Sequence, residues 1–126
     1  MASELRVDTL KDSSGNNSVG MAYVAGGSAK AWVHFNASTG TPTAQGSLNL
    51  SSITDSGVGI FQPTYSSAFA NDDYSFVAIT GTGSAGGWAI EAADRTATRT
   101  KMYTLSSTDN LSDYSHNNAL AHGDLA

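Results

Sequence analysis

The sequence contains no cysteine and only two prolines, and charged residues occupy just 13% of its 126 positions. The absence of cysteine excludes disulfide bonds and thiolate metal sites, and it removes any cysteine signal for the redox compartment. An average soluble domain is roughly 25% charged; here serine, threonine, asparagine, glycine and alanine fill the difference. Thirteen glycines beside two prolines indicate frequent turns. The composition is typical of uncharged, β-rich domains of extracellular type; adhesins and virion proteins often have it, and so do many other β domains.

Positive charge is also scarce, because the formal net charge is −5. A nucleic-acid or anionic-membrane partner needs a basic surface, so we expect neither nucleic-acid binding nor membrane insertion. The N-terminal residues contain no apolar run of signal-peptide length, and no later segment approaches a membrane span. We therefore expect synthesis in a cytoplasm without a signal peptide. The length predicts one main domain with a modest core.

Apolar and polar side chains alternate along residues 29–36, the stretch around which the rest of the chain is organised. One side carries Ala31, Val33 and Phe35, and the other carries Lys30, Trp32, His34 and Asn36. A period of two is that of a half-buried strand, whereas a helix would place Val33 and Phe35 on different faces. An amphipathic ring such as Trp32 among polar neighbours usually packs against something beyond its own sheet. We therefore predict that Trp32, with His34 beside it, lies in an interface with a neighbouring subunit.

Turn-forming residues recur about every 8–12 positions, the rhythm of a sandwich or a barrel. Residues 48–53 and 60–65 flank the turn signal at 55–59, so they predict a hairpin, and Pro63 places its second arm toward a sheet edge. Residues 74–80 form the most apolar strand and are expected at the centre of the sheet.

Two later segments are less distinct. For residues 87–95 we favour a strand, although the run Ala-Ile-Glu-Ala-Ala also permits a helix. Residues 108–118 are interpreted as a polar tail.

The predicted fold is all-β, an antiparallel β-sandwich of jelly-roll-like form. Its predicted core includes Phe35, Leu50, Phe76 and Ile79.

Residues 1–27 differ from the rest of the chain. Two short strand-like pieces, at 5–10 and 19–24, flank a polar turn, and such pieces cannot bury much alone. We therefore predict an N-terminal attachment or trimerisation segment at 1–27, which needs a partner, and a β-sandwich domain at 28–126.

Several segments together resemble tail-fibre and other virion proteins of bacteriophages, particularly marine ones. Residues 29–36 resemble a "KAWVNFN" segment of those proteins, and residues 47–59 are similar to their "SFNVSSITDNGTG". Residues 71–77 resemble "NANYSV", and the opening at 5–17 and the ending at 123–126 resemble the two ends of such fibres. The chain departs from this pattern at His34, where the family usually has asparagine, and throughout residues 81–118.

The resemblance implies a virion surface protein that assembles as a homotrimer and carries no catalytic residues. We expect a short tail fibre or fibre-tip module that takes part in host-surface recognition. The alternative is a head-decoration or head-fibre protein with a purely structural role. In either case other virion proteins would be partners through residues 1–27, and the chain would be located in the virion.

Patterns that could carry chemistry have simpler explanations. Residues 81–86 match G-x-G-x-x-G, but the acidic residue needed about twenty positions later is missing, so we favour an inter-strand loop and expect no cofactor. His34, His116 and His122 could hold a metal, yet ordinary surface or packing roles are favoured. Aspartates at 72–73, 109 and 113 are better explained as turn caps than as calcium ligands. Glu91 and Asp94 show no paired-carboxylate arrangement, so we expect no catalysis.

A recognition surface is predicted around the glycine-rich loop at 81–87. Trp88 follows this loop, and Arg95 and Arg99 lie across the next turn. Aromatic faces stack on sugar rings, and guanidinium groups bind acidic groups. We therefore predict that Trp88, Arg95 and Arg99 bind a host cell-surface glycan. The alternative, that Trp88 begins a strand and fills the core, stays open.

Overall fold

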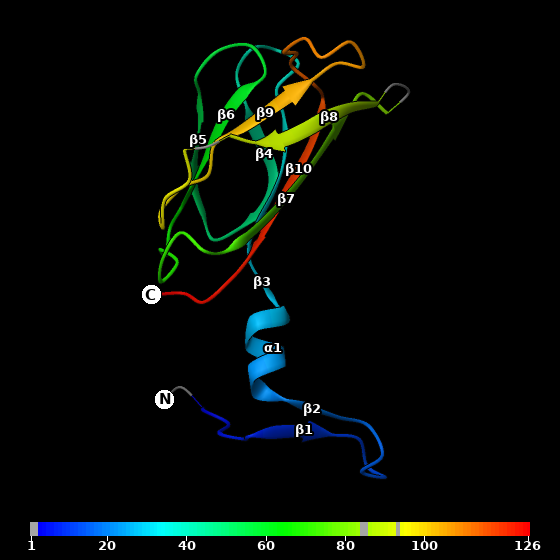
Figure 1. Cartoon of the computed structure of the whole chain (residues 1–126), viewed down its shortest axis with the longest axis vertical. Helices are drawn as coiled ribbons and strands as arrows, with labels where there is room; N and C mark the ends of the chain where they lie inside the picture. The colour runs from blue at the N-terminus through cyan, green and yellow to red at the C-terminus, as the bar shows by residue number, and fades with distance from the viewer. Residues whose placement is uncertain (1–2, 84–85, 93) are drawn as a thin grey trace.

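The computed structural model describes residues 3–83, 86–92 and 94–126, and it is all-β apart from one short helix. Figure 1 shows a β-barrel-like body with a separate N-terminal arm below it. The elements in chain order are β1 (Thr9–Lys11), β2 (Ser18–Gly20), α1 (Met21–Gly27), β3 (Ala29–Asn36), β4 (Thr43–Leu48), β5 (Leu50–Asp55), β6 (Ile60–Tyr65), β7 (Ser75–Gly81), β8 (Gly86–Glu91), β9 (Met102–Leu105) and β10 (His116–His122).

Eight strands form one antiparallel sheet in the order β4-β3-β10-β7-β8-β9-β6-β5. The two outermost strands, β4 and β5, are consecutive in the chain and joined at Asn49, whose φ is 54°. Asparagine tolerates this left-handed conformation better than most residues. The sheet therefore curls back on itself into a nearly closed barrel (Figure 1).

The core lies inside this curled sheet. Val33, Phe35, Phe61 and Met102 are buried in one cluster, where the rings of Phe35 and Phe61 meet edge to face with centroids 5.2 Å apart. The alternation predicted for residues 29–36 is confirmed, because Ala31, Val33 and Phe35 are buried. Burial of each large apolar side chain stabilises the fold by about 1.5–3 kcal/mol.

The predicted burial of Ile79 is wrong, since 65% of this side chain is exposed. Along β7 the inward positions belong to Phe76, Ala78 and Thr80, so a residue three places from Phe76 must face outward. Phe76 itself is partly buried against the core, as is Leu50. Thr80 is buried and donates a hydrogen bond to the Asn117 side chain at 2.5 Å.

The predicted hairpin is confirmed, because β5 and β6 pair antiparallel. The edge position expected for its second arm is wrong, since β6 lies between β5 and β9. Pro63 is tolerated there because β6 pairs with β9 only at Ile60 and Phe61. Beyond Phe61 the irregular segment before β9 lies beside β6 instead, and the Thr100 amide donates to the Pro63 carbonyl at 3.1 Å.

The central position of residues 74–80 is confirmed, because β7 lies between β10 and β8. Residues 87–95 begin as the strand β8, as favoured. β7 and β8 form an antiparallel hairpin, so a strand follows the glycine-rich loop where a dinucleotide motif needs a helix. Residues 84 and 85 of that loop lie outside the described residues.

The interpretation of residues 108–118 as a polar tail is wrong for its last part, because β10 begins at His116 and pairs with both β3 and β7. Asn117 is buried in β10, and its side chain is hydrogen-bonded there. Its side-chain amide donates to the carbonyls of Phe35 at 3.3 Å and Tyr114 at 2.8 Å. A satisfied buried amide costs little compared with an unpaired one.

The N-terminal arm stands clear of the barrel (Figure 1). β1 and β2 pair antiparallel, but the strand-like piece predicted at 19–24 is wrong beyond Gly20, because α1 begins at Met21. The helix has no buried residue. Lys30 anchors its end by donating from Nζ to the Ala25 carbonyl.

Candidate functional site

The outer face of the barrel carries a row of apolar side chains across β4, β3, β10 and β7. Trp32 is paired in register with Leu48 on one side and with Leu120 on the other, and Leu120 is paired with Val77. These four side chains are 37–56% exposed. Side chains that oppose one another in neighbouring strands point to the same face. The sheet therefore presents a continuous apolar band to its surroundings.

This band is almost free of charge. The four strands, all of whose residues the structure describes, contain one residue with a formal charge at neutral pH, Lys30 at the start of β3. A sheet face that contacts water normally carries polar and charged side chains, while the face toward the core carries apolar ones. An exposed apolar band without charged side chains is typical of interaction surfaces.

A shallow groove of about 300 Å³ lies within the band. Its walls are Trp32, Leu120, Val77 and Ile79, and its floor includes Ala78 and Ala119. Asn118 also lines the groove and is the one polar side chain among its lining residues. The groove can accept an apolar or aromatic side chain, and the Asn118 amide can donate or accept a hydrogen bond.

Two of the three histidines lie together at one end of the band. The rings of His34 and His116 stack with centroids 5.8 Å apart and an interplanar angle of 13°. His122 lies at the other end of β10, where it pairs with Ala29 and Ser75. In the described parts of the chain, no three histidine, cysteine, aspartate or glutamate residues are grouped closely enough to hold a metal ion.

Trp88 lies on β8 with 61% of its surface exposed, so it does not fill the core. β8 follows β7 in the sheet, and Trp88 is paired with Leu105 of β9. A separate groove of about 280 Å³ beside it is lined by Gly86, Gly87, Trp88 and Ser107.

Arg95 and Arg99 are held by contacts within the chain. Arg95 Nε lies 2.9 Å from Glu91 Oε1, and an Nη atom of Arg95 donates to the Tyr74 carbonyl. The Arg95 guanidinium also lies over the Tyr74 ring, 5.1 Å from its centroid, a distance at which a cation and an aromatic face attract. Arg99 pairs more loosely with Asp94 at 3.4 Å.

The three residues predicted for glycan binding therefore do not share one groove. Arg95 lines a polar groove of about 360 Å³ together with Asp72, Glu91 and Ala92, whereas Trp88 belongs to the groove beside Ser107. Sequence reasoning missed Asp72 and Glu91 as neighbours of Arg95. It also missed Leu120, Val77 and Ile79 as neighbours of Trp32. No local signal marked these neighbours, because the buried positions of β10 hold Asn117, Ala119 and Ala121.

A hydroxyl cluster fixes the segment between β8 and β9 against the barrel. The Thr100 hydroxyl lies 2.7 Å from the Tyr65 hydroxyl and 2.5 Å from that of Tyr74. Tyr74 also donates toward the carbonyls of Thr96 and Arg99. Burial raises the pKa of both tyrosines, although the hydrogen bonds from Thr100 act in the opposite direction. Both phenols therefore stay protonated at neutral pH and act as structural links.

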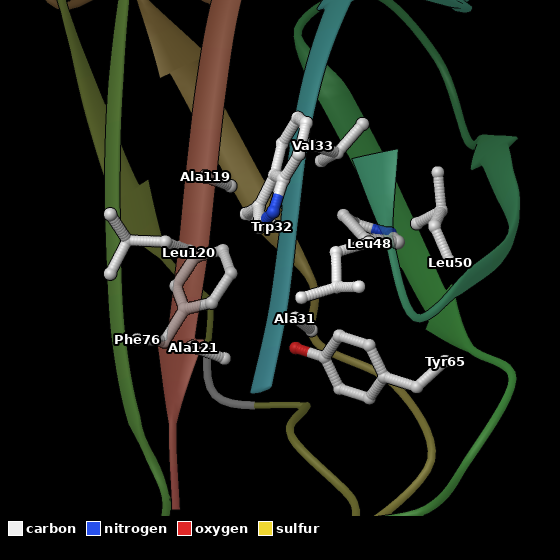
Figure 2. A pocket seen from close by; sticks show the side chains of 11 residues that line it. Ala31, Trp32, Val33, Leu48, Leu50, Tyr65, Phe76, Ala119, Leu120 and Ala121 are labelled. Carbon is white, nitrogen blue, oxygen red and sulfur yellow. The ribbon is translucent and has the colours of Figure 1, made fainter. Parts of the chain in front are cut away.

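The barrel interior has no room for a ligand at the cavity shown in Figure 2. This cavity measures about 10 Å³ and is lined mainly by apolar residues, among them Val33, Leu50, Tyr65 and Phe76. A single water needs roughly 10–15 Å³ by this measure. Binding by this chain must therefore use outer surfaces rather than this cavity.

Comparison with protein-family models, with curated proteins and with solved structures gives no match to this chain. Within the part of the chain that the structure describes, no helix has the length and apolar character needed to cross a membrane.

Proposed function

We propose that this chain is a bacteriophage virion surface protein, a subunit of a short tail fibre or fibre-tip module that takes part in host-surface recognition. The proposal starts from the resemblance of residues 5–17, 29–36 and 47–59 to such proteins. The structural observation that carries it is the uncharged apolar band on the outer face of β4, β3, β10 and β7. A fibre module exists as an assembly, and this band supplies the surface that an assembly buries.

The proposed assembly is a homotrimer with Trp32 and His34 in the subunit interface. Trp32 lies at the centre of the apolar band, and His34 lies on the same face two residues later. Trimers close around a threefold axis when identical contacts repeat three times. The proposed role is structural and includes recognition of the host surface, without catalysis or a cofactor.

Residues 1–27 are proposed to attach the trimer to other virion proteins or to help form it. Leu5, Leu10, Val19 and Tyr23 are exposed in the arm, and α1 buries no residue. A segment that buries so little apolar surface does not offset its own conformational entropy without a partner.

We describe the body more finely as a barrel flattened into a two-layer sandwich, because Phe35 and Phe61 face each other from strands far apart in the sheet. The jelly-roll connectivity suggested by the sequence is not part of this proposal. Four pairs of strands that are consecutive in the chain are neighbours in the sheet, and β10 returns beside β7, so that β10-β7-β8-β9 forms one Greek key.

Host glycan is the proposed target of the fibre module. Trp88 is exposed, and Arg95 lies in a polar groove beside two carboxylates. One observation favours the alternative of a head-decoration protein with no ligand of its own. Arg95 and Arg99 are both engaged in ion pairs within the chain, and Trp88 lies in a different groove.

Labelling of virus particles tests the proposal. Gold-labelled Fab fragments raised against the purified full chain should decorate the tail of particles of the virus that encodes it, and the unlabelled fragments should block adsorption to host cells. Fragments first saturated with purified protein are the matched control. Labelling confined to the head with normal adsorption would support the head-decoration alternative. Particles without any specific label would contradict a virion role.

A further inference from the structure

The exposed apolar face of the barrel continues beyond β7 onto β8. The pairing of Thr80 with Gly87 sets the register of these two strands, so Ile79 lies opposite Trp88 one step further along. Both side chains are exposed, and Ile79 lines the groove beside Trp32. Trp88 therefore stands on the same outward face as that groove.

This extended face is large enough for a contact between copies of the chain. It carries seven exposed large apolar side chains, Leu48, Trp32, Leu120, Val77, Ile79, Trp88 and Ile90. They present on the order of 700 Å², taking about 200 Å² for each side chain when it is fully exposed. The largest apolar patch of a typical monomer is about 300–600 Å², and each partner in a standard interface buries about 800 Å². Because β4, β7 and β10 carry no formal charge, identical faces meet there without like-charge repulsion.

Two stacked histidines stand at one end of this face. His34 follows Trp32 on the outward side of β3 and is paired with Asn118, which lines the groove. His116 is exposed two residues before Asn118 on β10, and the two imidazole rings stack with centroids 5.8 Å apart. Side chains of directly paired residues stand about 4.5–5.5 Å apart. A second copy that covers the groove at Asn118 therefore also meets the histidine pair.

No carboxylate pairs with these two rings in the described chain, where each ion pair joins an arginine to its own partner. The flanking strands β4 and β7 contain no titratable side chain. Lys30 on β3 donates to a backbone carbonyl of α1, and His122 lies at the far end of β10. In the segment before β10, Asp109 is exposed, Asp113 accepts from a turn amide, and Tyr114 is a buried phenol. A positive charge on His34 or His116 would thus lack a compensating partner.

We propose that protonation of His34 and His116 releases one copy of this chain from the next, so that the subunit contact holds at neutral pH and weakens in mild acid. This inference rests on the proposed homotrimer and adds a regulation of its interface. Histidine ordinarily changes charge between about pH 5 and pH 8. Neutral rings can be covered at little cost. Two protonated rings place like charges 5.8 Å apart, and a partner that covers them must also remove their hydration.

Proton linkage gives the direction of the effect. In the free subunit both rings face water and take up protons readily, whereas the covered rings of the assembly take them up less readily. Dissociation therefore binds protons, and a lower pH favours the free subunits. The contact should be complete above about pH 7 and should weaken progressively between about pH 7 and pH 5.

Sedimentation velocity of the full chain at micromolar concentration, at about pH 7.5 and about pH 5, tests the proposal. The parent should associate about tenfold or more weakly at the lower pH. The double variant His34→Gln with His116→Gln carries no charge at these positions, so its association should change by less than about threefold between the two conditions. His122→Gln is the matched control, because it removes a histidine of the same strand outside the stacked pair. It should dissociate in acid like the parent.

Thermal unfolding of each protein at both pH values shows whether the fold is intact. If the double variant does not assemble at neutral pH, His116→Gln alone replaces it, and this variant should show a smaller acid effect than the parent. An unchanged acid effect in that variant would overturn the proposal.

The remaining outcomes separate the histidine pair from the trimer itself. A parent that is equally assembled at both pH values would overturn the acid release and leave the proposed trimer standing. Full acid dissociation of the double variant, or loss of the acid effect in His122→Gln, would overturn the assignment to His34 and His116. Unfolding of the parent at about pH 5 would overturn the release as well, because the assembly would then be lost with the fold. A parent that is monomeric at neutral pH would overturn both the release and the proposed trimer.

Discussion

Phe35 has no exposed surface, and its ring meets Phe61 edge to face at the centre of the barrel. Replacing it with alanine removes these contacts and leaves a cavity that neighbouring strands cannot fill. We expect Phe35→Ala to lower the free energy of unfolding by roughly 3–5 kcal/mol, measured by urea denaturation. A small domain has about 5–15 kcal/mol in total, so the variant should be close to unfolding at ambient temperature.

Val58→Ala is the control for this measurement, because Val58 is exposed in the turn between β5 and β6. It should change the unfolding free energy by no more than about 0.5 kcal/mol. A Phe35→Ala protein as stable as this control would show that Phe35 does not occupy the core.

Single residues were predictable where local alternation decides burial. Phe35 follows from the period of its own strand, whereas Ile79 was misplaced because hydrophobicity was given more weight than its spacing from Phe76. Asn117 could not be predicted as buried, since its partners Thr80 and Phe35 lie far away in sequence. Burial of a polar side chain depends on such distant partners.

In the candidate sites too, single residues could be chosen from the local sequence, but their partners could not. Trp32 was identified as an interface residue from its polar neighbours, but its partners Leu120 and Val77 come from strands that only the fold brings together. Arg95 was chosen for its chemistry alone. Its contact with Tyr74 spans 21 residues, and nothing local in the sequence reports it.

At the scale of elements, the hairpin of β5 and β6 was predictable because turn residues stand between two alternating segments. β10 was not, since its inward positions hold Asn117, Ala119 and Ala121 and its one large apolar residue, Leu120, faces outward. Its strand conformation comes from pairing on both sides, which overrides weak local preference. α1 is too short for a clear helical period.

Gly59, at the start of the second arm of the β5–β6 hairpin, tests how tightly the elements are packed. Its φ is +66°, and an added Cβ would lie 2.6 Å from both the Ser112 nitrogen and the Thr104 oxygen. Both atoms are backbone, so they cannot move aside cheaply. We expect Gly59→Ala to destabilise the fold by about 1–3 kcal/mol beyond the conformational penalty, measured by thermal and urea unfolding.

Gly40→Ala separates the cost of a left-handed backbone from the cost of the steric clash. Gly40 has a similar φ of +77°, but nothing lies within 4 Å of its added Cβ. This variant should show only the penalty of a left-handed backbone, about 1–2 kcal/mol. Equal losses at the two positions would mean that the segment around Ser112 is not packed against the hairpin.

At the scale of the whole molecule, the barrel and the N-terminal arm follow different physical rules. The sheet curls into a nearly closed barrel because β4 and β5, the ends of the sheet, are joined directly at Asn49. All large clusters of buried side chains belong to residues 31–121 in the described chain. A change in sequence composition indicated the arm, but only the structure shows that α1 and the β1–β2 hairpin contribute nothing to this core.

Hydrogen exchange should therefore separate the two parts in the monomeric chain at high dilution. Amides in β3 and β10 are paired in the middle of the sheet, and they should exchange only on global unfolding, with protection above about 10³-fold. Residues 9–27 are mostly exposed and bury no apolar core, so we expect protection of their amides within about tenfold of an unfolded peptide. Mass spectrometry of peptic fragments resolves both regions in one experiment, and β3 and β10 serve as internal controls.

The concentration dependence of exchange then identifies what orders the arm. If sister chains bind it, protection of residues 9–27 should rise as the trimer forms, together with protection around Trp32. If another virion protein binds it, the arm should stay unprotected in the trimer and become protected only in the particle. Strong protection of residues 9–27 in the dilute monomer would contradict both, because the arm would then be stable without a partner.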